Sequence, residues 1–402
     1  MPRYIYSAKT QPDKITQSTI EAESEQDAVN KLTEMGYFPI SVESEVISLD
    51  KQKSLAFKKI PSRDLVMFTR QLSSLIESGV NIINSLTIIS NQTNNKYLKA
   101  ILNDITSQVK DGKSLLESFS SHPKLFSPLY SAMIQTGESS GRLNETLRRL
   151  AEYLEKEQEF KDSLRAALVY PIFICFVGIG TVLVLLMFVI PRLVTMFEDM
   201  GQVLPLPTRI LIDTSHFLRN WSWIILVVII LAVFFLRRLY ENPRGRLSFD
   251  TFKLKLAVFG EIILKTEISR LMRTLSLLIS SSVPITSALE TSESILQNQI
   301  LKAEVERFKE QIKNGYSFSS SLKESKFFPE FVSNIIVIGE ETGVLDKSLM
   351  RIADDYEREV DRTLKNLTRL LEPVIILVMG LIVGFIVLSM LLPIFQINLI
   401  VR

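Results

Sequence analysis

Three apolar segments without a charged residue constrain this chain more than any other feature. They cover residues 172–190, 221–236 and 374–392, in a sequence of 402 residues of which 22% are charged. A helix needs about 20 apolar residues to cross a bilayer core. Since one central charge costs roughly 2.5 to 3.5 kcal/mol on insertion, charge-free windows favour membrane spans over buried helices of a soluble domain. The middle segment is short, but Arg219, Arg237 and Arg238 flank it and can extend toward the headgroups.

The distribution of lysine and arginine predicts how these segments are oriented. Basic residues gather before the first segment, after the second and before the third, whereas the loop 192–219 balances three arginines with three acidic residues. Cytoplasmic flanks of membrane helices carry the excess of basic residues. The N-terminal region and the stretch 240–372 are therefore predicted to be cytoplasmic. The loop 192–219 and the tail 394–402 are predicted to face the other side of the membrane.

A repeat covers most of the chain. Residues 68–86 align with 271–289 at an offset of 203, with Arg70 opposite Arg273. One residue is then lost, and residues 136–147 align with 338–349 at an offset of 202. Pairs of prolines open and close the outer apolar segments at the same offset: Pro171 and Pro373, then Pro191 and Pro393. The repeated unit is thus a cytoplasmic region followed by its membrane helix, and the middle span keeps both units in the same orientation.

Apolar spacing predicts that each copy is a helical bundle. In the first copy, one stripe runs from Leu65 to Ile76, and Gly79 is a suitable residue to end that helix. The second copy has Ser282 at the position of Gly79. No glycine interrupts residues 142–177, where Pro171 is the one proline, so a single helix is predicted to run from the first bundle into the membrane.

The region before the first copy has a different pattern. Polar alternation over 3–10 and 14–24 predicts strands, Ser24 is a suitable N-cap for a short helix that Gly36 ends, and 38–43 predicts another strand. The predicted fold class is therefore a mostly α membrane protein with two homologous cytoplasmic helical bundles, three transmembrane helices and a small N-terminal α+β domain. The predicted divisions are the α+β domain 1–50, a linker 51–61, copy one 62–170, transmembrane helix 171–191, periplasmic loop 192–219, transmembrane helix 220–239, copy two 240–372, transmembrane helix 373–393 and periplasmic tail 394–402.

The residues offer no catalytic constellation. The phosphate-binding pattern G-x-x-x-x-G-K-[ST] is absent, and Ser139 in G-E-S-S-G has no serine counterpart in the second copy, which has G-E-E-T-G. The acidic pairs Asp354–Asp355 and Glu340–Glu341 are typical of solvated helix faces more than of a cation site. A net charge of +2 gives no sign of a nucleic-acid partner. We therefore predict no enzyme activity, cofactor, metal or nucleic acid.

Two copies of a G-E-x-x-G-x-L motif, three apolar spans and this order of segments resemble the type II secretion protein F family. The matching residues are Gly137, Glu138, Gly141 and Leu143, and then Gly339, Glu340, Gly343 and Leu345. The dipeptides Tyr170–Pro171 and Glu372–Pro373 and the stretch 204–211 also resemble family features. The resemblance covers essentially the whole chain, and its specificity lies in the ordered set of motifs.

The resemblance implies a non-catalytic platform in a bacterial inner membrane, multi-pass, with a cytoplasmic N-terminus and a periplasmic C-terminus. It implies the coupling of a cytoplasmic hexameric assembly ATPase to the polymerisation of pilin or pseudopilin subunits, in type IV pilus biogenesis or type II protein secretion. Other inner-membrane assembly proteins, membrane lipid and further copies of the chain are the remaining expected partners. A small-solute transporter or a passive membrane scaffold is the alternative, although three helices without an internal charge make a poor transport pathway.

Two sets of residues are candidates for structural or partner roles. We expect the glycines of the two G-E-x-x-G motifs to supply a positive φ or a close approach, and Glu138 and Glu340 to lie near a helix N-terminus. An ordinary structural corner between helices is the simpler interpretation of the same motifs. Glu372 lies at the membrane edge, where it is predicted either to pair with Arg369 or with a passing pilin, or to be an interfacial residue without such a duty.

Overall fold

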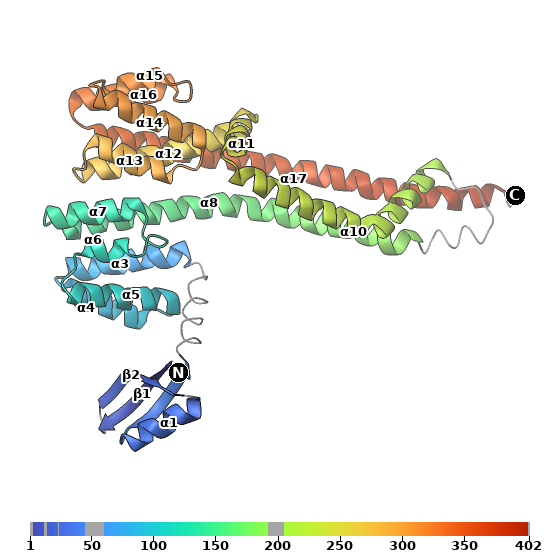
Figure 1. The fold of residues 1–402 in the computed structure, drawn as a ribbon. Coiled ribbons are helices and arrows are strands. Elements are labelled where there is room, and N and C mark those ends of the chain that lie inside the picture. The colour runs from blue at the N-terminus through green and yellow to red at the C-terminus, as the bar shows by residue number, and fades with distance from the viewer. Residues whose placement is uncertain (1–2, 12–13, 23, 45–59, 192–204, 401–402) are drawn as a thin grey trace. The chain divides into compact units, whose positions relative to one another are not determined.

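The chain forms two compact units, residues 1–125 and 126–402, in a computed structural model that describes residues 3–11, 14–22, 24–44, 60–191 and 205–400 (Figure 1). Most of the described residues are helical. The predicted linker 51–61 lies outside the described residues except for its last two positions. Each unit has a core of its own, so the two are treated separately.

The first unit begins with a three-stranded antiparallel sheet in the order β2-β1-β3. Its strands are β1 (Arg3–Gln11), β2 (Lys14–Glu21) and β3 (Phe38–Ser44), and helix α1 (Glu25–Glu34) lies between β2 and β3 in sequence. Ser24 caps α1, because its hydroxyl accepts the Asp27 N–H at 3.1 Å. Tyr6 and Ala8 of β1 pack against Leu32 of α1. Burial of these side chains holds the helix on one face of the sheet.

Four helices complete the first unit. Asn81, Asn95 and Ser114 cap three of them by accepting backbone N–H groups, so short polar residues set where each helix begins. Phe68 and Phe119 meet edge to face, with ring centroids 6.3 Å apart. The helices are α3 (Ser62–Glu77), α4 (Ile82–Gln92), α5 (Lys96–Lys110) and α6 (Leu115–Ser120).

The second unit is helical throughout its described residues. It contains α7 (Pro128–Ser139), α8 (Leu143–Val184), a π-helical turn η1 (Leu185–Val189), α10 (Leu206–Glu241), α11 (Pro243–Lys255), α12 (Phe259–Ser280), α13 (Ile285–Ile295), α14 (Gln299–Lys313), α15 (Phe318–Lys323), α16 (Glu330–Thr342) and α17 (Leu345–Ile400). Helices α12 and α16 pack on the first part of α17, and α13, α14 and α15 pack in succession between them (Figure 1).

The boundaries of the helices repeat as the sequence alignment predicts. Helix α4 begins at Ile82 and α13 at Ile285, which keeps the offset of 203, whereas α8 begins at Leu143 and α17 at Leu345, which keeps the offset of 202. Helices α6 and α15 still begin 203 residues apart, whereas α7 and α16 begin 202 apart, so the second copy lacks one residue in the connection between α15 and α16. The structure thus gives each copy six helices in the same order: α3 to α8, and α12 to α17.

The turn after the first helix of each copy has the same backbone conformation despite a different residue. Gly79 follows α3 with φ of 83°, and Ser282 follows α12 with φ of 67°. A side chain in this left-handed region costs roughly 1 to 2 kcal/mol, whereas glycine adopts it freely. Ser282 therefore stores strain that the first copy avoids.

Replacing Ser282 with glycine should stabilise the second unit. Relief of the left-handed strain exceeds the extra entropy that glycine gains on unfolding, so we expect a gain of about 0.5 to 1 kcal/mol. Chemical denaturation of the full chain in detergent measures the difference, and Gly79→Ser provides the reciprocal control with the opposite sign. A loss of stability in Ser282→Gly would mean that the hydroxyl makes a contact worth more than the strain.

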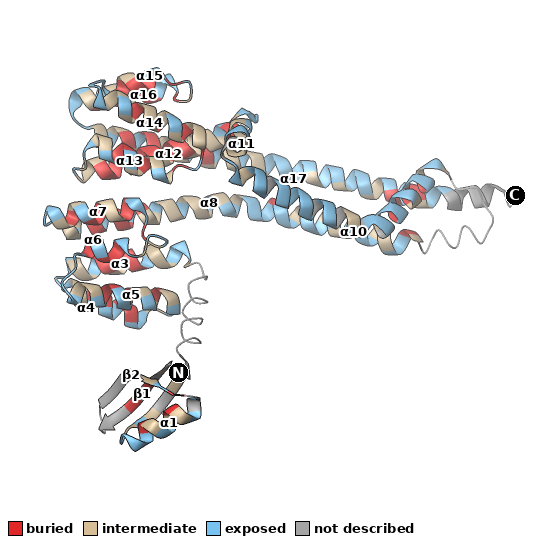
Figure 2. Ribbon diagram, in the orientation of Figure 1, coloured by how far each residue is buried: buried red, intermediate tan, exposed pale blue. Residues whose placement is uncertain are grey.

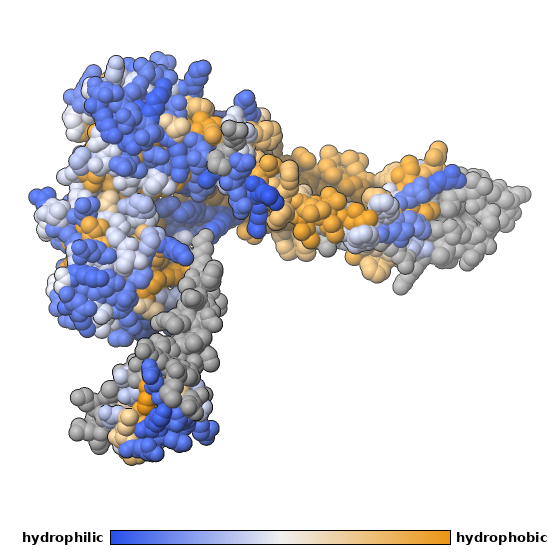
Figure 3. Space-filling view, in the orientation of Figure 1, coloured by the Kyte–Doolittle hydropathy of each residue, from blue (hydrophilic) through white to orange (hydrophobic). Residues whose placement is uncertain are grey.

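Two helices in the described residues are long and apolar enough to cross a membrane. They cover Leu143–Val189 and Leu345–Leu392, and only 6% and 11% of the residues in their most apolar stretches are buried. Buried helices of a soluble core would hide these side chains, whereas here they face outward (Figures 2 and 3). The prediction that one helix continues from the bundle through Pro171 is confirmed, because α8 is unbroken there.

Helix α10 begins earlier than the sequence indicated. Residues 192–219 were predicted to be a loop, but those from Leu206 onward are helical, and 192–204 lie outside the described residues. Leu211 of this segment is buried with Leu186, Ile190 and Ile386 of the outer apolar helices. The prediction of a loop was wrong here because it rested on the pattern of charges, which does not reveal apolar residues at helical spacing.

The start of α10 also satisfies two carbonyl groups that prolines leave without a helical partner. Pro393 has no N–H to offer the carbonyl of Ser389 one turn earlier, and the Thr208 hydroxyl donates to that carbonyl at 2.5 Å. In η1 the Ile190 N–H bonds to Leu185, and the next residue, Pro191, has no N–H for Leu186. The Ser215 hydroxyl donates to the Leu186 carbonyl at 2.5 Å. Thr208 and Ser215 are two turns apart and both are buried, so one face of α10 joins the ends of the two repeated helices.

Candidate functional site

The first glycine of each G-E-x-x-G motif lies where two helices approach closely. A Cβ atom on Gly339 would lie 2.6 Å from Ser348 Oγ and 3.1 Å from Leu345 Cα at the start of α17. At the equivalent corner between α7 and α8, a Cβ atom on Gly137 would lie 3.1 Å from the Thr146 side chain. Both distances are shorter than ordinary van der Waals contact, so a side chain at either position would push the following long helix away.

The second glycine of each motif ends one helix and allows the next to begin. Gly141 has φ of 67° and Gly343 has φ of 71°, a left-handed conformation that glycine adopts without strain. The next residue but one starts the long helix in each copy, Leu143 in α8 and Leu345 in α17. The two glycines therefore have different tasks: close approach for the first and chain reversal for the second.

Glu340 joins this corner to the neighbouring helix α15. Its carboxylate accepts the backbone N–H of Phe318 at 2.9 Å and that of Ser319 at 3.1 Å. These N–H groups belong to the first turn of α15, where helices have donors without internal partners. Glu138 holds the same position in α7 and is half-buried. The acidic residue of the second motif thus orients the corner, and neither an ion nor a substrate is needed to explain its charge.

Glu372 lies on the side of α17 that faces α8. The Tyr170 hydroxyl donates to Glu372 Oε1 at 3.0 Å, and these two residues hold equivalent positions in the repeat, 202 residues apart. Two further bonds connect the same helices on the side nearer the bundles: Ser163 Oγ donates to Asp361 at 2.9 Å, and Thr368 Oγ1 donates to the Ala167 carbonyl at 3.3 Å. The two repeated helices therefore enter the apolar region side by side, tied at the same level.

Helix α8 also packs directly on the second copy. Tyr153 Oη lies 3.0 Å from Thr274 Oγ1 of α12, and Arg149 donates to the Ser280 carbonyl at 2.9 Å at the end of that helix. Burial raises the pKa of Tyr153, and the charge of Glu157 adds to this, so the phenol remains neutral. The final helix of copy one is thus fixed against the first helix of copy two.

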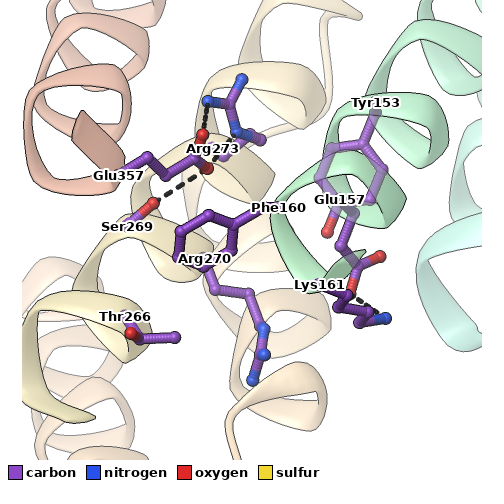
Figure 4. A pocket seen from close by; sticks show the side chains of 9 residues that line it. All are labelled: Tyr153, Glu157, Phe160, Lys161, Thr266, Ser269, Arg270, Arg273 and Glu357. Carbon is purple, nitrogen blue, oxygen red and sulfur yellow. Dashed lines mark hydrogen bonds and ion pairs between the residues drawn. The ribbon is translucent and has the colours of Figure 1, made fainter. Parts of the chain in front are cut away.

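A cavity of about 20 Å³ lies among α8, α12 and α17 (Figure 4). That volume is sufficient for a water molecule and far too small for an organic ligand. Side chains of both signs surround it. Its lining residues are Tyr153, Glu157, Phe160, Lys161, Thr266, Ser269, Arg270, Arg273 and Glu357.

Arg273 is the central charge of this region and is only 6% exposed. Its guanidinium binds both oxygens of Glu357, at 2.8 and 2.7 Å (Figure 4). It also donates to Asp354 at 2.7 Å. Burial alone would lower the pKa of Arg273, but hydrogen bonds and charges from Glu357 and Asp354 outweigh it and raise the pKa. Ser269 donates to Glu357 at 3.1 Å and completes the set of polar contacts. The first and last helices of the copy are thereby locked together.

Sequence reasoning missed this cluster. Arg273 was noticed as the counterpart of Arg70, and Asp354 was assigned to a solvated helix face. Two features of the sequence could have indicated the cluster: Asp354 and Glu357 lie on one face of a helix, and the arginine recurs in the repeat. Asp355 lies beside Asp354 but pairs with Arg358 at 2.6 Å on the exposed side. Within the described residues, His, Cys, Asp and Glu form no group of three that could hold a metal ion.

Comparison with known proteins gives a consistent result over the whole chain. The family model described as "Type II secretion system (T2SS), protein F" matches twice, over residues 68–191 and 271–393. A second model, "Type II secretion system protein F, N-terminal domain", matches residues 1–43. The two matches begin and end at positions that correspond in the repeat, so the repeat predicted from the sequence is confirmed.

Relatives of similar length carry two kinds of name. The chain is 37% identical to the type IV pilus assembly protein PilC of Thermus thermophilus, over 99% of this chain and 98% of the relative. It is 34% identical to the protein of the same name from Myxococcus xanthus, over 98% and 94%. It is 31% identical to type II secretion system protein F of Vibrio cholerae, over 99% of both chains.

Proposed function

This chain belongs to the type II secretion protein F family, and from that premise we propose that it is the inner-membrane platform of a type IV pilus or type II secretion machine. The platform couples a cytoplasmic hexameric assembly ATPase to the polymerisation of pilin or pseudopilin subunits. In this proposal the chemical energy comes from the ATPase, and this chain transmits movement. Other inner-membrane assembly proteins, membrane lipid and further copies of this chain are its remaining partners.

In the proposed topology, α8, α10 and α17 each cross the inner membrane once. The spans are 171–191, 220–239 and 373–393, with 192–219 and 394–402 in the periplasm. The N-terminal α+β domain, 1–50, and the two bundles, 62–170 and 240–372, lie in the cytoplasm. The exposed apolar side chains of α8 and α17 support this topology, as do Val227, Val228 and Ile230 on α10.

The observation that best supports a mechanical role is the continuity of α8 and α17 from bundle to apolar region. Each helix starts at a G-E-x-x-G corner and reaches the membrane edge beside its counterpart. Between these points α8 packs on α12, and α17 binds Arg273 of α12. A push on either bundle would therefore reach the membrane along a continuous helix, from which Pro171 or Pro373 removes one backbone hydrogen bond without ending it. The angle of each long helix is set at its corner, by Gly137, Glu138 and Gly141 for α8 and by Gly339, Glu340 and Gly343 for α17. Glu372 lies where α17 enters the bilayer.

Copurification tests the platform function. The full chain, solubilised from its native membrane, should retain a hexameric ATPase and a pilin-like subunit, and its deletion should abolish fibres or secretion. If vesicles containing this protein alone moved a small solute, the chain would be a transporter. If deletion left fibres and secretion intact, the platform function would be wrong.

Changing Glu372 to glutamine tests the membrane-edge site. Glutamine still accepts the hydrogen bond from Tyr170 but has no charge, so we expect about tenfold fewer fibres or less secreted protein at an unchanged protein level. Asp355→Asn, which removes a half-buried carboxylate elsewhere on α17, is the matched control and should have no effect. Normal assembly in Glu372→Gln would mean that the charge of Glu372 has no role in assembly and that this residue is only interfacial.

A further inference from the structure

Apolar side chains are exposed where α11 turns into α12, and no described residue of the second unit covers them. Phe252 of α11 is 59% exposed, Leu256 and Val258 in the turn 256–258 are 40% and 45% exposed, and Phe259, the first residue of α12, is 60% exposed. Isolated apolar residues are common on protein surfaces, but these four lie within eight residues of one another and form a patch. This patch lies just after α10, and neither the bundle contacts nor the repeat explains it.

The opposite face of α11 is fixed to the bundle. Asp250 is 1% exposed, and its carboxylate accepts the Gln299 backbone N–H at 3.1 Å, in the first turn of α14. The Asn298 side chain donates to the Asp250 carbonyl at 3.5 Å. Asp250 and Phe252 are two residues apart, which places them on opposite sides of a helix. Anchoring through Asp250 therefore holds Phe252 outward.

The position of α11 suits the surface of a membrane. Pro243, the first residue of α11, lies seven positions after Leu236, the last residue of the apolar segment, which is about 10 Å along a helix. That distance reaches from the hydrocarbon edge into the headgroup layer. In Figure 1, α11 is seen nearly along its axis while α10 and α17 run across the picture, so α11 crosses the direction of the long helices.

The charges around the patch favour an anionic surface. Between Arg237 and Lys255 there are six basic and two acidic residues. Arg246 and Lys253 lie over the ring of Tyr240, at 5.0 and 5.1 Å from its centroid, which gathers positive charge at the junction of α10 and α11. Basic residues that flank an apolar helix face are typical of helices that lie in the headgroup region of an anionic bilayer.

We propose that α11 and the turn after it lie in the membrane interface and insert Phe252, Leu256 and Phe259 among the lipids of the cytoplasmic leaflet, while the surrounding basic residues bind anionic headgroups. Lipid, and not a protein partner, is the occupant, because the patch continues directly from a membrane span and shares its basic flank. The inference rests on the proposed topology in which α10 crosses the membrane. In that role α11 keeps the second bundle at a fixed height above the bilayer.

Lipid quenching of a fluorophore tests the proposal on the full chain. The single native cysteine is removed by Cys175→Ser, and one cysteine is then introduced and labelled by Phe252→Cys, by Phe331→Cys or by Val228→Cys. Phe331, on α16, is the matched control because it is an equally exposed phenylalanine, at 53%. Val228 reports on the α10 span itself. Each variant is reconstituted in nanodiscs with lipids brominated near the headgroup or deep in the acyl chain, with or without phosphatidylglycerol.

We expect shallow bromines to quench the label at 252 at least about threefold more than the label at 331, and deep bromines to quench the label at 228. Replacing Arg246 and Lys255 with glutamine should remove most of any increase that phosphatidylglycerol produces at 252. Quenching at 228 but not at 252 would overturn the inference and leave the topology intact. Absence of quenching at 228 would overturn both. Shielding of the label at 252 from lipid and from aqueous iodide alike would indicate a protein contact, and would equally overturn the proposal.

Discussion

Replacing Gly339 with valine should destabilise the second unit by about 3 kcal/mol, the upper end of the usual cost of overpacking. Even a Cβ atom at this position would lie 2.6 Å from Ser348 Oγ and 3.1 Å from the Leu345 backbone, and valine adds two more methyl groups. The Ser348 side chain can rotate, but the Leu345 backbone cannot move without shifting the start of α17. Chemical denaturation of the full chain in detergent measures the loss.

Two further variants isolate the steric cause. Gly380→Val places the same side chain on the next helix, α17, at a position where a Cβ atom would meet no other atom within 4 Å, so it should be close to neutral. Adding Ser348→Gly to Gly339→Val removes the nearest obstacle and should restore about half of the lost stability. Equal losses in Gly339→Val and Gly380→Val would show that the substitution acts through helix propensity, and the close approach at the corner would then have no energetic role.

The sequence was sufficient for features that depend on local pattern. The apolar stripe from Leu65 to Ile76 predicted α3, the absence of glycine from residues 142–177 predicted an unbroken α8, and the repeat supplied their counterparts. The chemistry of glycine predicted that Gly137, Gly141, Gly339 and Gly343 provide either a close approach or a positive φ. The structure assigns these tasks in the order close approach first and positive φ second.

Features that depend on contacts between distant segments were not predictable in the same way. The partner of Glu372 is Tyr170, its own counterpart in the repeat, and not Arg369 as one interpretation held. Thr208 and Ser215 gave no signal, since a hydroxyl in a mixed segment is ordinary until a carbonyl freed by a proline is placed beside it. Pairing of this kind follows from how helices pack, and a single sequence does not contain it.

The buried Arg273 cluster should give the second large effect, a loss of about 3 to 4 kcal/mol on replacement of Arg273 with methionine. Methionine fills similar space but leaves Glu357, whose side chain is only 19% exposed, without its cation. Arg358→Met is the matched control: Arg358 also pairs with an aspartate on α17, but it is 65% exposed, so its loss should change stability by less than about 0.5 kcal/mol.

A second substitution separates the value of the ion pair from the cost of the abandoned charge. In Arg273→Met combined with Glu357→Leu no buried charge is left, and most of the lost stability should return, because apolar side chains of similar size replace buried pairs well. Arg273→Lys should lie between the extremes, since an ammonium cannot bind both oxygens of Glu357 and Asp354 together. If the double variant were as unstable as Arg273→Met alone, the geometry of the pair itself would be what holds α12 against α17. If Arg273→Met cost no more than Arg358→Met, the cluster would contribute nothing to stability despite its burial.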